Sequence, residues 1–144
     1  MNPGDPFDLD RFIQAQAGTY AQALAELHGG RKRTHWMWFV FPQLVGLGHS
    51  AMSRRFGISG LAEARAYLSH PVLGARLREC SDVVAASTVS AHDLFGSPDD
   101  LKLRSCMTLF EAAGDDPCFR AVLASKFDGT PCTRTLELLH ARGP

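Results

Sequence analysis

The feature that most constrains this chain is the segment of residues 34–50, THWMWFVFPQLVGLGHS. It holds both tryptophans of the chain, Trp36 and Trp38. Each buried aromatic ring removes roughly 150–250 Å² from water, so a solvated loop would not carry this much aromatic surface. The segment therefore belongs in the core, yet it contains His35 and Gln43, polar groups that a plain core would not select. This conflict predicts a functional site here.

Periodicity does not decide between helix and strand for the run from Trp36 to Phe41, because the run is apolar on every side. We favour a short buried helix that ends at Pro42, since the residue before a proline is biased away from the helical conformation. Gly46 and Gly48 would then let the chain leave the aromatic run through a turn.

Length and composition predict one globular domain. The chain has 144 residues, of which 45% are hydrophobic and 21% charged, as is ordinary for a soluble protein. The formal net charge is zero, which gives no overall field for nucleic acid or an anionic membrane. No apolar run approaches the roughly 20 residues that span a bilayer. We expect a cytoplasmic protein, with a monomer favoured and with neither nucleic acid nor membrane as a partner.

The four cysteines predict neither a disulfide nor a metal site. They form no CxxC pair and show no metal-like spacing with histidine. We interpret them as reduced thiols in a reducing compartment, and we expect no cofactor. Cys106 has no neighbouring base in the sequence, which argues against a thiol nucleophile there.

Apolar residues recur at three- and four-residue steps along most of the chain, as is typical of amphipathic helices. The first predicted helix is capped by Asp8, runs from Leu9 to Leu27 and stops at Gly29. Ser59 is the predicted cap of the next long helix. The other predicted helices lie within residues 71–87, 97–113, 117–128 and 133–139, with short turns at 50–56 and 91–95. The sequence therefore predicts an all-α fold: an N-terminal tail of residues 1–7, then a compact single-domain bundle of about seven helices in residues 8–144.

Several polar residues are candidates for a ligand site, and each has a structural alternative. His35 is either a ligand-facing imidazole or a core histidine bound to a carbonyl. Gln43 either reads the edge of a base or amide, or satisfies loop backbone. Gln16 lies on the apolar stripe of the first helix and should be buried and hydrogen-bonded, whereas Gln14 should be solvated.

Basic residues could hold an anionic group near the same segment. Lys102 lies three residues before Ser105 on a predicted helix, and Arg31, Lys32 and Arg33 precede the aromatic run. Such side chains bind phosphate by charge and by bidentate guanidinium contacts. The alternative for each is an exposed, solvated cation. The chain lacks the GxGxxG, GxxxxGK[ST], HExxH and GxSxG motifs, so it carries none of these common nucleotide-binding and hydrolase signatures.

Four stretches, FIQAQ, GRKRTHWMWFVFPQLVGLGHS, EARAYLSHPVLGARL and DDLKLRSCMTLF, resemble the bacterial domain-of-unknown-function family 1810 (DUF1810). The resemblance runs from about Asp8 to Leu139 and implies a compact, mainly helical domain. Members often carry the label calpastatin. Calpain inhibitors, however, are long disordered chains, and the composition here is that of a packed globule.

A weaker similarity links FIQAQ and SCMTLFEAAGDDPCFRAVLASKFDGT to the NADAR superfamily of ADP-ribose-processing proteins. In that superfamily an acidic residue before the FQAQ run and tryptophans lining the pocket serve N-glycosidic cleavage. The resemblance implies Asp10 as the acid and Trp36 or Trp38 as a pocket wall. The candidate catalytic residues are Asp10, which this resemblance implies, and His35, whose imidazole opens the aromatic run.

Two function classes remain open. The first is a pocket for a nucleotide or ADP-ribose-like ligand, with N-glycosidase-like hydrolysis as its extension. It would lie where the first helix, the aromatic run and the helix of residues 100–110 meet, and its predicted ligand-binding residues are Gln16, His35, Trp36, Trp38, Gln43, Lys102 and Ser105. The second is a non-enzymatic protein-interaction module, in which these polar residues only stabilise the fold. The first class requires that Gln16, His35, Gln43 and Lys102 point into one cavity.

Overall fold

The computed structural model describes residues 4–142, in which the chain forms ten α-helices and no β-strand. The all-α prediction is confirmed, but the predicted number of about seven helices was too low. The additional helices come from short turns that prove helical and from one predicted helix that is broken in two. The helices are α1 (Asp10–Gln16), α2 (Tyr20–His28), α3 (Met37–Val40), α4 (Ala51–Arg55), α5 (Leu61–Ser69), α6 (Leu73–Ala86), α7 (Ala91–Phe95), α8 (Asp99–Ala113), α9 (Pro117–Phe127) and α10 (Thr133–Arg142).

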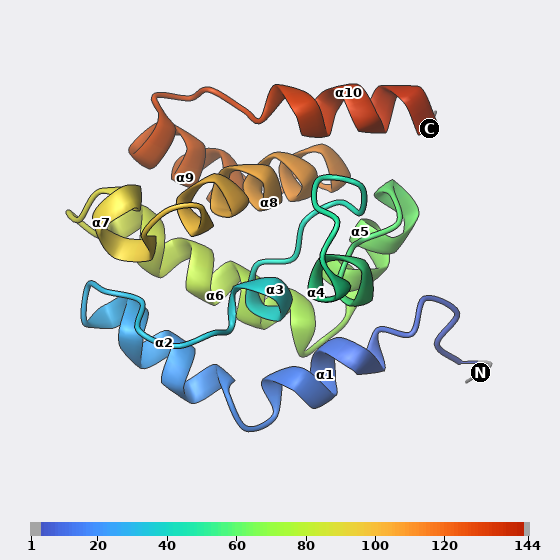
Figure 1. The fold of residues 1–144 in the computed structure, drawn as a ribbon, viewed down its shortest axis with the longest axis horizontal. Coiled ribbons are helices and arrows are strands. Elements are labelled where there is room, and N and C mark those ends of the chain that lie inside the picture. The colour runs from blue at the N-terminus through green and yellow to red at the C-terminus, as the bar shows by residue number, and fades with distance from the viewer. Residues whose placement is uncertain (1–3, 143–144) are drawn as a thin grey trace.

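The helices pack around α6, which crosses the middle of the molecule (Figure 1). Helices α8 and α9 pack together on one side with α10 on the outside of α8, while α1 and α2 follow the opposite edge (Figure 1). A chain of aromatic contacts crosses the core from α1 to α9. Phe12 lies 5.1 Å from Tyr67, Tyr67 lies 5.3 Å from Phe110, and Phe110 lies 5.9 Å from Phe119, measured between ring centroids. All four rings are fully buried.

The first predicted helix is two helices, α1 and α2, separated by a turn at residues 17–19. The turn keeps its backbone hydrogen bonds, because Thr19 N–H donates to Gln16 O at 3.0 Å and Ala23 N–H donates to Thr19 O at 2.9 Å. The apolar stripe continues through the turn, which is why the sequence pattern did not reveal it. Helix α1 packs against α3 and α2 packs against α6, and the turn lets the chain follow both surfaces.

Helix α1 is capped from the predicted tail and not by Asp8. The carboxylate of Asp5 accepts hydrogen bonds from the backbone N–H groups of Leu9 at 2.7 Å and Asp10 at 2.9 Å. Asp8 instead adopts a positive φ of 53° in the turn before the helix. The predicted cap at Ser59 also differs, because Gly60 occupies the position before α5.

The aromatic run contains the short helix α3, as predicted for residues 36–41. Its last residue is Val40, and Phe41 has already left the helical conformation before Pro42. Trp36 and Phe41 are buried to within 1% of full burial, and their ring centroids lie 6.1 Å apart. Truncating a side chain such as Trp36 to alanine costs about 3–5 kcal/mol of stability. The full burial of Trp36 confirms the prediction for that residue, whereas Trp38 is only partly buried.

Candidate functional site

Trp36 is held in the core by a buried carboxylate. Its indole N–H donates to Oε1 of Glu26 on α2 at 2.9 Å. The same carboxylate accepts four further hydrogen bonds, from Gln22 Nε2, Arg33 N–H, Thr34 N–H and Thr34 Oγ1, at 2.7–3.0 Å. Both faces of the Trp36 ring are covered by the core, so this tryptophan does not form a ligand-accessible wall.

The five donors around Glu26 also fix its charge. Burial alone would raise the pKa of this carboxyl group. The hydrogen bonds from Thr34, Arg33 and Gln22 outweigh burial and hold the pKa of Glu26 well below its ordinary range. Glu26 therefore remains a carboxylate that ties α2 to the start of the aromatic run.

Trp38 differs from Trp36 because part of its ring reaches the surface. The Nζ atom of Lys102, on α8, lies 3.7 Å from the centroid of the Trp38 ring. An ammonium group this close to an indole face is attracted by the negative potential of the ring. Lys102, on the helix of residues 100–110, thus contacts the aromatic run at Trp38.

Asp99 joins Lys102 to the basic residues that precede the aromatic run. Its Oδ1 atom lies 3.2 Å from Lys102 Nζ, and its Oδ2 atom lies 2.9 Å from Lys32 Nζ. Lys32 Nζ in turn lies 5.2 Å from the centroid of the Trp36 ring. One carboxylate is thus shared by two ammonium groups, so Lys32, Asp99 and Lys102 together carry one net positive charge. We refer to Trp38, Lys102, Asp99 and Lys32 as the Trp38 surface.

Gln16 is buried and hydrogen-bonded, as its place on the apolar stripe indicated. Its Nε2 donates to Phe39 O at 2.7 Å and to the hydroxyl of Tyr67 at 3.2 Å, and its Oε1 accepts from Arg76 at 3.2 Å. These bonds occupy both the nitrogen and the oxygen of the Gln16 amide, and none of them involves the Trp38 surface. Gln16 thus connects α1 to α3, α5 and α6.

His35 and Gln43 lie at the two ends of the aromatic run. The His35 side chain is exposed. Gln43 is half-buried, and its backbone carbonyl accepts from Ile58 N–H at 2.9 Å. Within residues 4–142, the Gln43 side-chain amide forms no hydrogen bond to another protein atom. It therefore retains its donors and its acceptor for solvent or a ligand.

Ser105 follows Lys102 by three residues on α8, and the printed partners of its hydroxyl lie outside the Trp38 surface. Its hydroxyl donates to Leu101 O at 3.1 Å, one turn earlier on α8, and lies 3.4 Å from Sγ of Cys132. Cys132 immediately precedes α10. Lys102 and Ser105, which the sequence analysis placed in one site, lie three residues apart on α8 and bind different partners.

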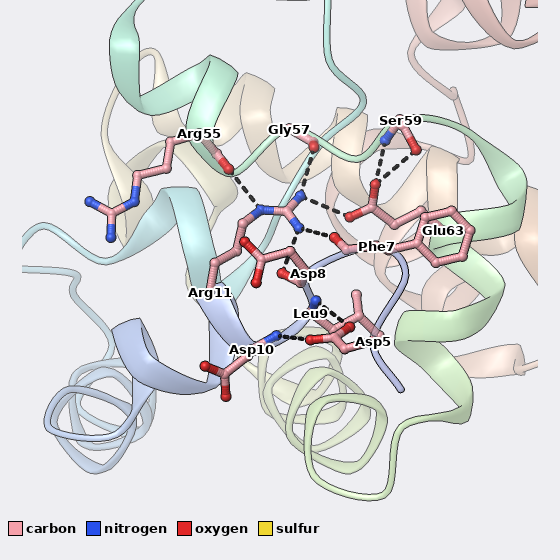
Figure 2. A network of polar contacts seen from close by, with 10 residues as sticks. All are labelled: Asp5, Phe7, Asp8, Leu9, Asp10, Arg11, Arg55, Gly57, Ser59 and Glu63. Carbon is pink, nitrogen blue, oxygen red and sulfur yellow. Dashed lines mark hydrogen bonds and ion pairs between the residues drawn. The ribbon is translucent and has the colours of Figure 1, made fainter. Parts of the chain in front are cut away.

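Arg11, beside Asp10 on α1, is the centre of the network shown in Figure 2. Its Nε donates to Arg55 O at 2.7 Å, and its other nitrogens donate to Phe7 O, Asp8 O, Gly57 O and Glu63 Oε2 at 2.6–3.0 Å. All five N–H groups of the guanidinium are thereby used. The second oxygen of Glu63 accepts from the N–H and hydroxyl of Ser59 (Figure 2). With no donor left for a ligand, Arg11 fixes the N-terminal segment to the α4–α5 connection.

Asp10, the candidate catalytic acid, lies apart from the tryptophans. It is exposed and lines a cavity of about 370 Å³ whose walls include Phe7, Ile13 and His70. Nδ1 of His70 accepts hydrogen bonds from the backbone N–H groups of Val72 at 3.1 Å and Leu73 at 3.3 Å. Such an acceptor nitrogen carries no proton. None of the residues of the Trp38 surface lines this cavity.

A larger cavity, of about 620 Å³, opens between the ends of α2 and α6. Its lining includes His28, Gly30, Asp82, Ser87 and Val89. Neither this cavity nor the one beside Asp10 is lined by Gln16, His35, Gln43 or Lys102. No hydrogen bond or ion pair joins any two of these four side chains in residues 4–142, so neither cavity meets the expectation that all four point into one. Lys102 contacts the aromatic run at Trp38.

Two site residues were missed in the sequence analysis. Glu26 falls beside Ala23 and Leu27 on the apolar stripe of α2, and a carboxylate in that position signals a buried acceptor. Asp99 lies in the first turn of α8, and it binds Lys32 from a distant part of the sequence, which no local pattern reveals.

The described residues offer no group of three or more His, Cys, Asp or Glu side chains placed to hold a metal ion. All four cysteines are free thiols. No helix in residues 4–142 combines the length and the apolarity needed to cross a bilayer.

Comparisons with known proteins place the chain among proteins without an assigned activity. The family model described as "Protein of unknown function (DUF1810)" matches residues 6–139. The crystal structure of the conserved hypothetical protein Rv1873 from Mycobacterium tuberculosis is similar to this chain, with 54% sequence identity and a TM-score of 0.93. The match covers 94% of this chain and 99% of the other. A search of curated proteins finds no match. The similarity to the NADAR superfamily stays a prediction.

Proposed function

Because the chain belongs to the DUF1810 family of proteins of unknown function, we propose its function from its own geometry: the Trp38 surface binds a small anionic ligand of the nucleotide or ADP-ribose class. The observation that carries the proposal is that two lysines share one carboxylate beside a partly exposed indole. A phosphate-bearing aromatic ligand matches both the charge and the ring.

The charge of the surface favours an anion. Lys32 and Lys102 both bind Asp99, so one of the two ammonium groups lacks a full counter-charge. Arg31 and Arg33 are exposed on either side of Lys32, and neither forms an ion pair within residues 4–142. A phosphate group would therefore find several donors within one short segment and the start of α8.

The indole and two free polar groups favour an aromatic ligand. Lys102 covers one face of Trp38, so a base would stack on the remaining exposed part of the ring or on the face that Lys102 vacates when it binds phosphate. The Gln43 amide has no hydrogen-bond partner among residues 4–142, and His35 is exposed; both flank the aromatic run. An amide of this kind reads donors and acceptors on the edge of a base.

The proposal covers binding, and hydrolysis does not follow from this surface. The carboxylate that the NADAR resemblance would use is Asp10, which lines the cavity beside His70. N-glycosidase-like cleavage by Asp10 would require a ligand bound in the cavity beside His70. Cleavage by His35 would instead require a ligand bound at the Trp38 surface. We place the protein in the cytoplasm, where free thiols remain reduced.

Thermal unfolding tests the proposal, with ADP-ribose, NAD and simple nucleotides added to the protein. A ligand at about 100 times its dissociation constant adds about 2.7 kcal/mol of stability. For a domain of this size, that gain raises Tm by about 5–10 °C. The shift should shrink as salt is added, because exposed charges are screened.

Lys102→Met keeps an unbranched side chain, one atom shorter, and removes its charge, so it should abolish the ligand-induced shift. Arg120→Met is the matched control, since Arg120 is an exposed cation paired with Glu111 away from Trp38. A shift that survives Lys102→Met would place the ligand elsewhere. If no nucleotide-like ligand raises Tm, the interaction-module hypothesis is favoured, and the exposed side chains Leu101 and Leu136 are its first candidate contacts.

A further inference from the structure

Asp99 binds both lysines of the Trp38 surface. Its Oδ2 atom lies 2.9 Å from Lys32 Nζ, and its Oδ1 atom lies 3.2 Å from Lys102 Nζ. The two oxygens of one carboxylate are therefore divided between two ammonium groups. Asp99 thus already makes the contact with each lysine that a phosphate oxygen of a ligand would make.

The two lysines differ in how readily they can exchange this carboxylate for a ligand. Only 8% of the Lys32 side chain is exposed, and its ammonium group lies 5.2 Å from the centroid of the buried Trp36 ring. The Lys102 side chain is 20% exposed and lies over the partly exposed Trp38 ring. Separating a buried ion pair costs more than separating an exposed one, because the remaining charges are less well solvated. A ligand should therefore take Lys102 from Asp99 and leave the pair of Lys32 and Asp99 intact.

We propose that Asp99 is a specificity-determining residue of the Trp38 surface, which favours a ligand with a single negative charge on the phosphate that binds Lys102. The inference rests on the proposed function, because it concerns the same surface. While Asp99 stays on Lys32, that pair is neutral, and Lys102 is left to balance the ligand. A second charge on the same phosphate would lie close to the Asp99 carboxylate, which repels it.

This charge limit names a class of ligand within the nucleotide and ADP-ribose group. A phosphodiester carries one charge, and so does each phosphate of the diphosphate bridge in ADP-ribose. A terminal phosphate has a second pKa of about 6 and carries roughly 1.5 to 2 charges at pH 7. The surface should therefore prefer diester and bridging phosphates to terminal phosphates.

The next residue, Asp100, provides a matched control for Asp99. Its Oδ1 atom accepts from Leu101 N–H at 2.9 Å, and its Oδ2 atom lies 3.6 Å from His92 Nδ1 on α7. Its side chain is 17% exposed, compared with 20% for Asp99. Two carboxylates of equal charge and similar exposure thus begin α8, but the lysines bind Asp99. Asp99→Asn and Asp100→Asn each remove one negative charge and keep the shape of the side chain.

The test compares two probes with the same base and sugar. Adenosine 3′,5′-cyclic monophosphate (cyclic AMP) is a phosphodiester with one charge, whereas adenosine 5′-monophosphate (AMP) has a terminal phosphate with nearly two charges at pH 7.5. Isothermal titration calorimetry at low salt measures both dissociation constants for the wild type and for the two variants. We expect the wild type to bind AMP no more tightly than cyclic AMP.

In Asp99→Asn, the affinity for AMP relative to cyclic AMP should rise roughly three- to tenfold, because the repelling charge is gone. In Asp100→Asn the same ratio should change by less than about twofold, because that charge is farther from the phosphate and screened. Arg31 and Arg33 are present in all three proteins, so the comparison isolates the two carboxylates.

Three outcomes overturn the inference. The first is a wild type that binds AMP more tightly than cyclic AMP, and the second is an equal ratio in wild type and Asp99→Asn. The third is a loss of affinity for both probes by the same factor in Asp99→Asn, which would show that Asp99 only positions the lysines. In each case the proposed function stands, because the probes bind. If neither probe binds any of the three proteins, the inference fails, and titration with ADP-ribose decides the proposed function separately.

A measurement on the wild type alone tests the inference even if Asp99→Asn does not fold. Between pH 7.5 and pH 5, AMP loses its second charge, whereas cyclic AMP keeps its single charge. The affinity for AMP relative to cyclic AMP should therefore rise as the pH falls. Cyclic AMP corrects for protonation of the exposed His35, which acts on both probes. A ratio that stays constant or falls over this range contradicts the role of Asp99.

Discussion

The indole N–H of Trp36 and the carboxylate of Glu26 are joined by a hydrogen bond of 2.9 Å inside the core. Both side chains are at least 95% buried, so the fold encloses a charge beside its largest ring. The four other donors to this carboxylate come from α2 and from residues 33–34. Glu26 thus fixes the position from which the aromatic run begins.

Glu26→Gln should lower the free energy of unfolding by about 3 kcal/mol at pH 7, because an amide places donors against donors in a buried site. The pKa of Glu26 is depressed in the folded state, so its contribution is fully present above the unfolded-state pKa of about 4.3. That contribution is lost as pH falls through the lower folded-state pKa. The gap between wild type and variant should therefore narrow below about pH 4.

Urea unfolding at a series of pH values measures that gap. Glu137→Gln, at an exposed carboxylate paired with Arg134, is the control and should change stability by less than about 0.5 kcal/mol. A constant gap from pH 7 to pH 3 would mean that Glu26 is not the stabilising carboxylate described here.

Gln16→Ala should cost about 2 kcal/mol or more, because Phe39 O and the Arg76 guanidinium lose a buried partner. The exposed Gln14→Ala, on the same helix, should cost little. Chemical unfolding of the two variants compares them directly. Because the hydrogen-bond partners of Gln16 lie outside the Trp38 surface, the Gln16→Ala variant should still bind ligand there. Loss of binding with unchanged stability would show that Gln16 is part of the ligand site.

Gly74→Ala should destabilise the fold by about 1–3 kcal/mol through overpacking. A Cβ atom at Gly74 would lie 2.1 Å from the backbone oxygen of Leu68, so α5 and α6 would have to separate. Gly60→Ala is the matched control, because its added Cβ meets no atom within 4 Å and its φ of 167° is extended backbone. Equal melting temperatures for the two variants would contradict the close approach of α6 to α5.

The sequence was informative about local structure and much less so about distant pairing. The apolar period predicted the long helices, and the aromatic run with Pro42 predicted α3. The break between α1 and α2 was missed because the apolar stripe passes through Gly18 and Thr19 without a change of phase. What bends the chain there is the different partner of each half, α3 for one and α6 for the other.

The candidate site shows the same limit. Burial of Gln16 followed from its place on the stripe, but its partners Phe39, Tyr67 and Arg76 lie 23 to 60 residues away in the sequence. Periodicity reports which face of a helix is buried and carries no information about which distant group meets it. For this reason Gln16 and Lys102 were assigned to one site, although their hydrogen bonds and ion pairs in residues 4–142 go to different partners.

The most direct test of the account is a fluorescence titration of the wild-type protein with ADP-ribose at low salt. Trp36 is fully buried, so a ligand on the Trp38 surface should alter the emission of Trp38 alone. We predict a saturable change with a dissociation constant below about 1 mM, lost in Trp38→Phe and in Lys102→Met. An emission spectrum that stays constant up to saturating ADP-ribose, or a change that Trp38→Phe leaves intact, would contradict binding at this surface.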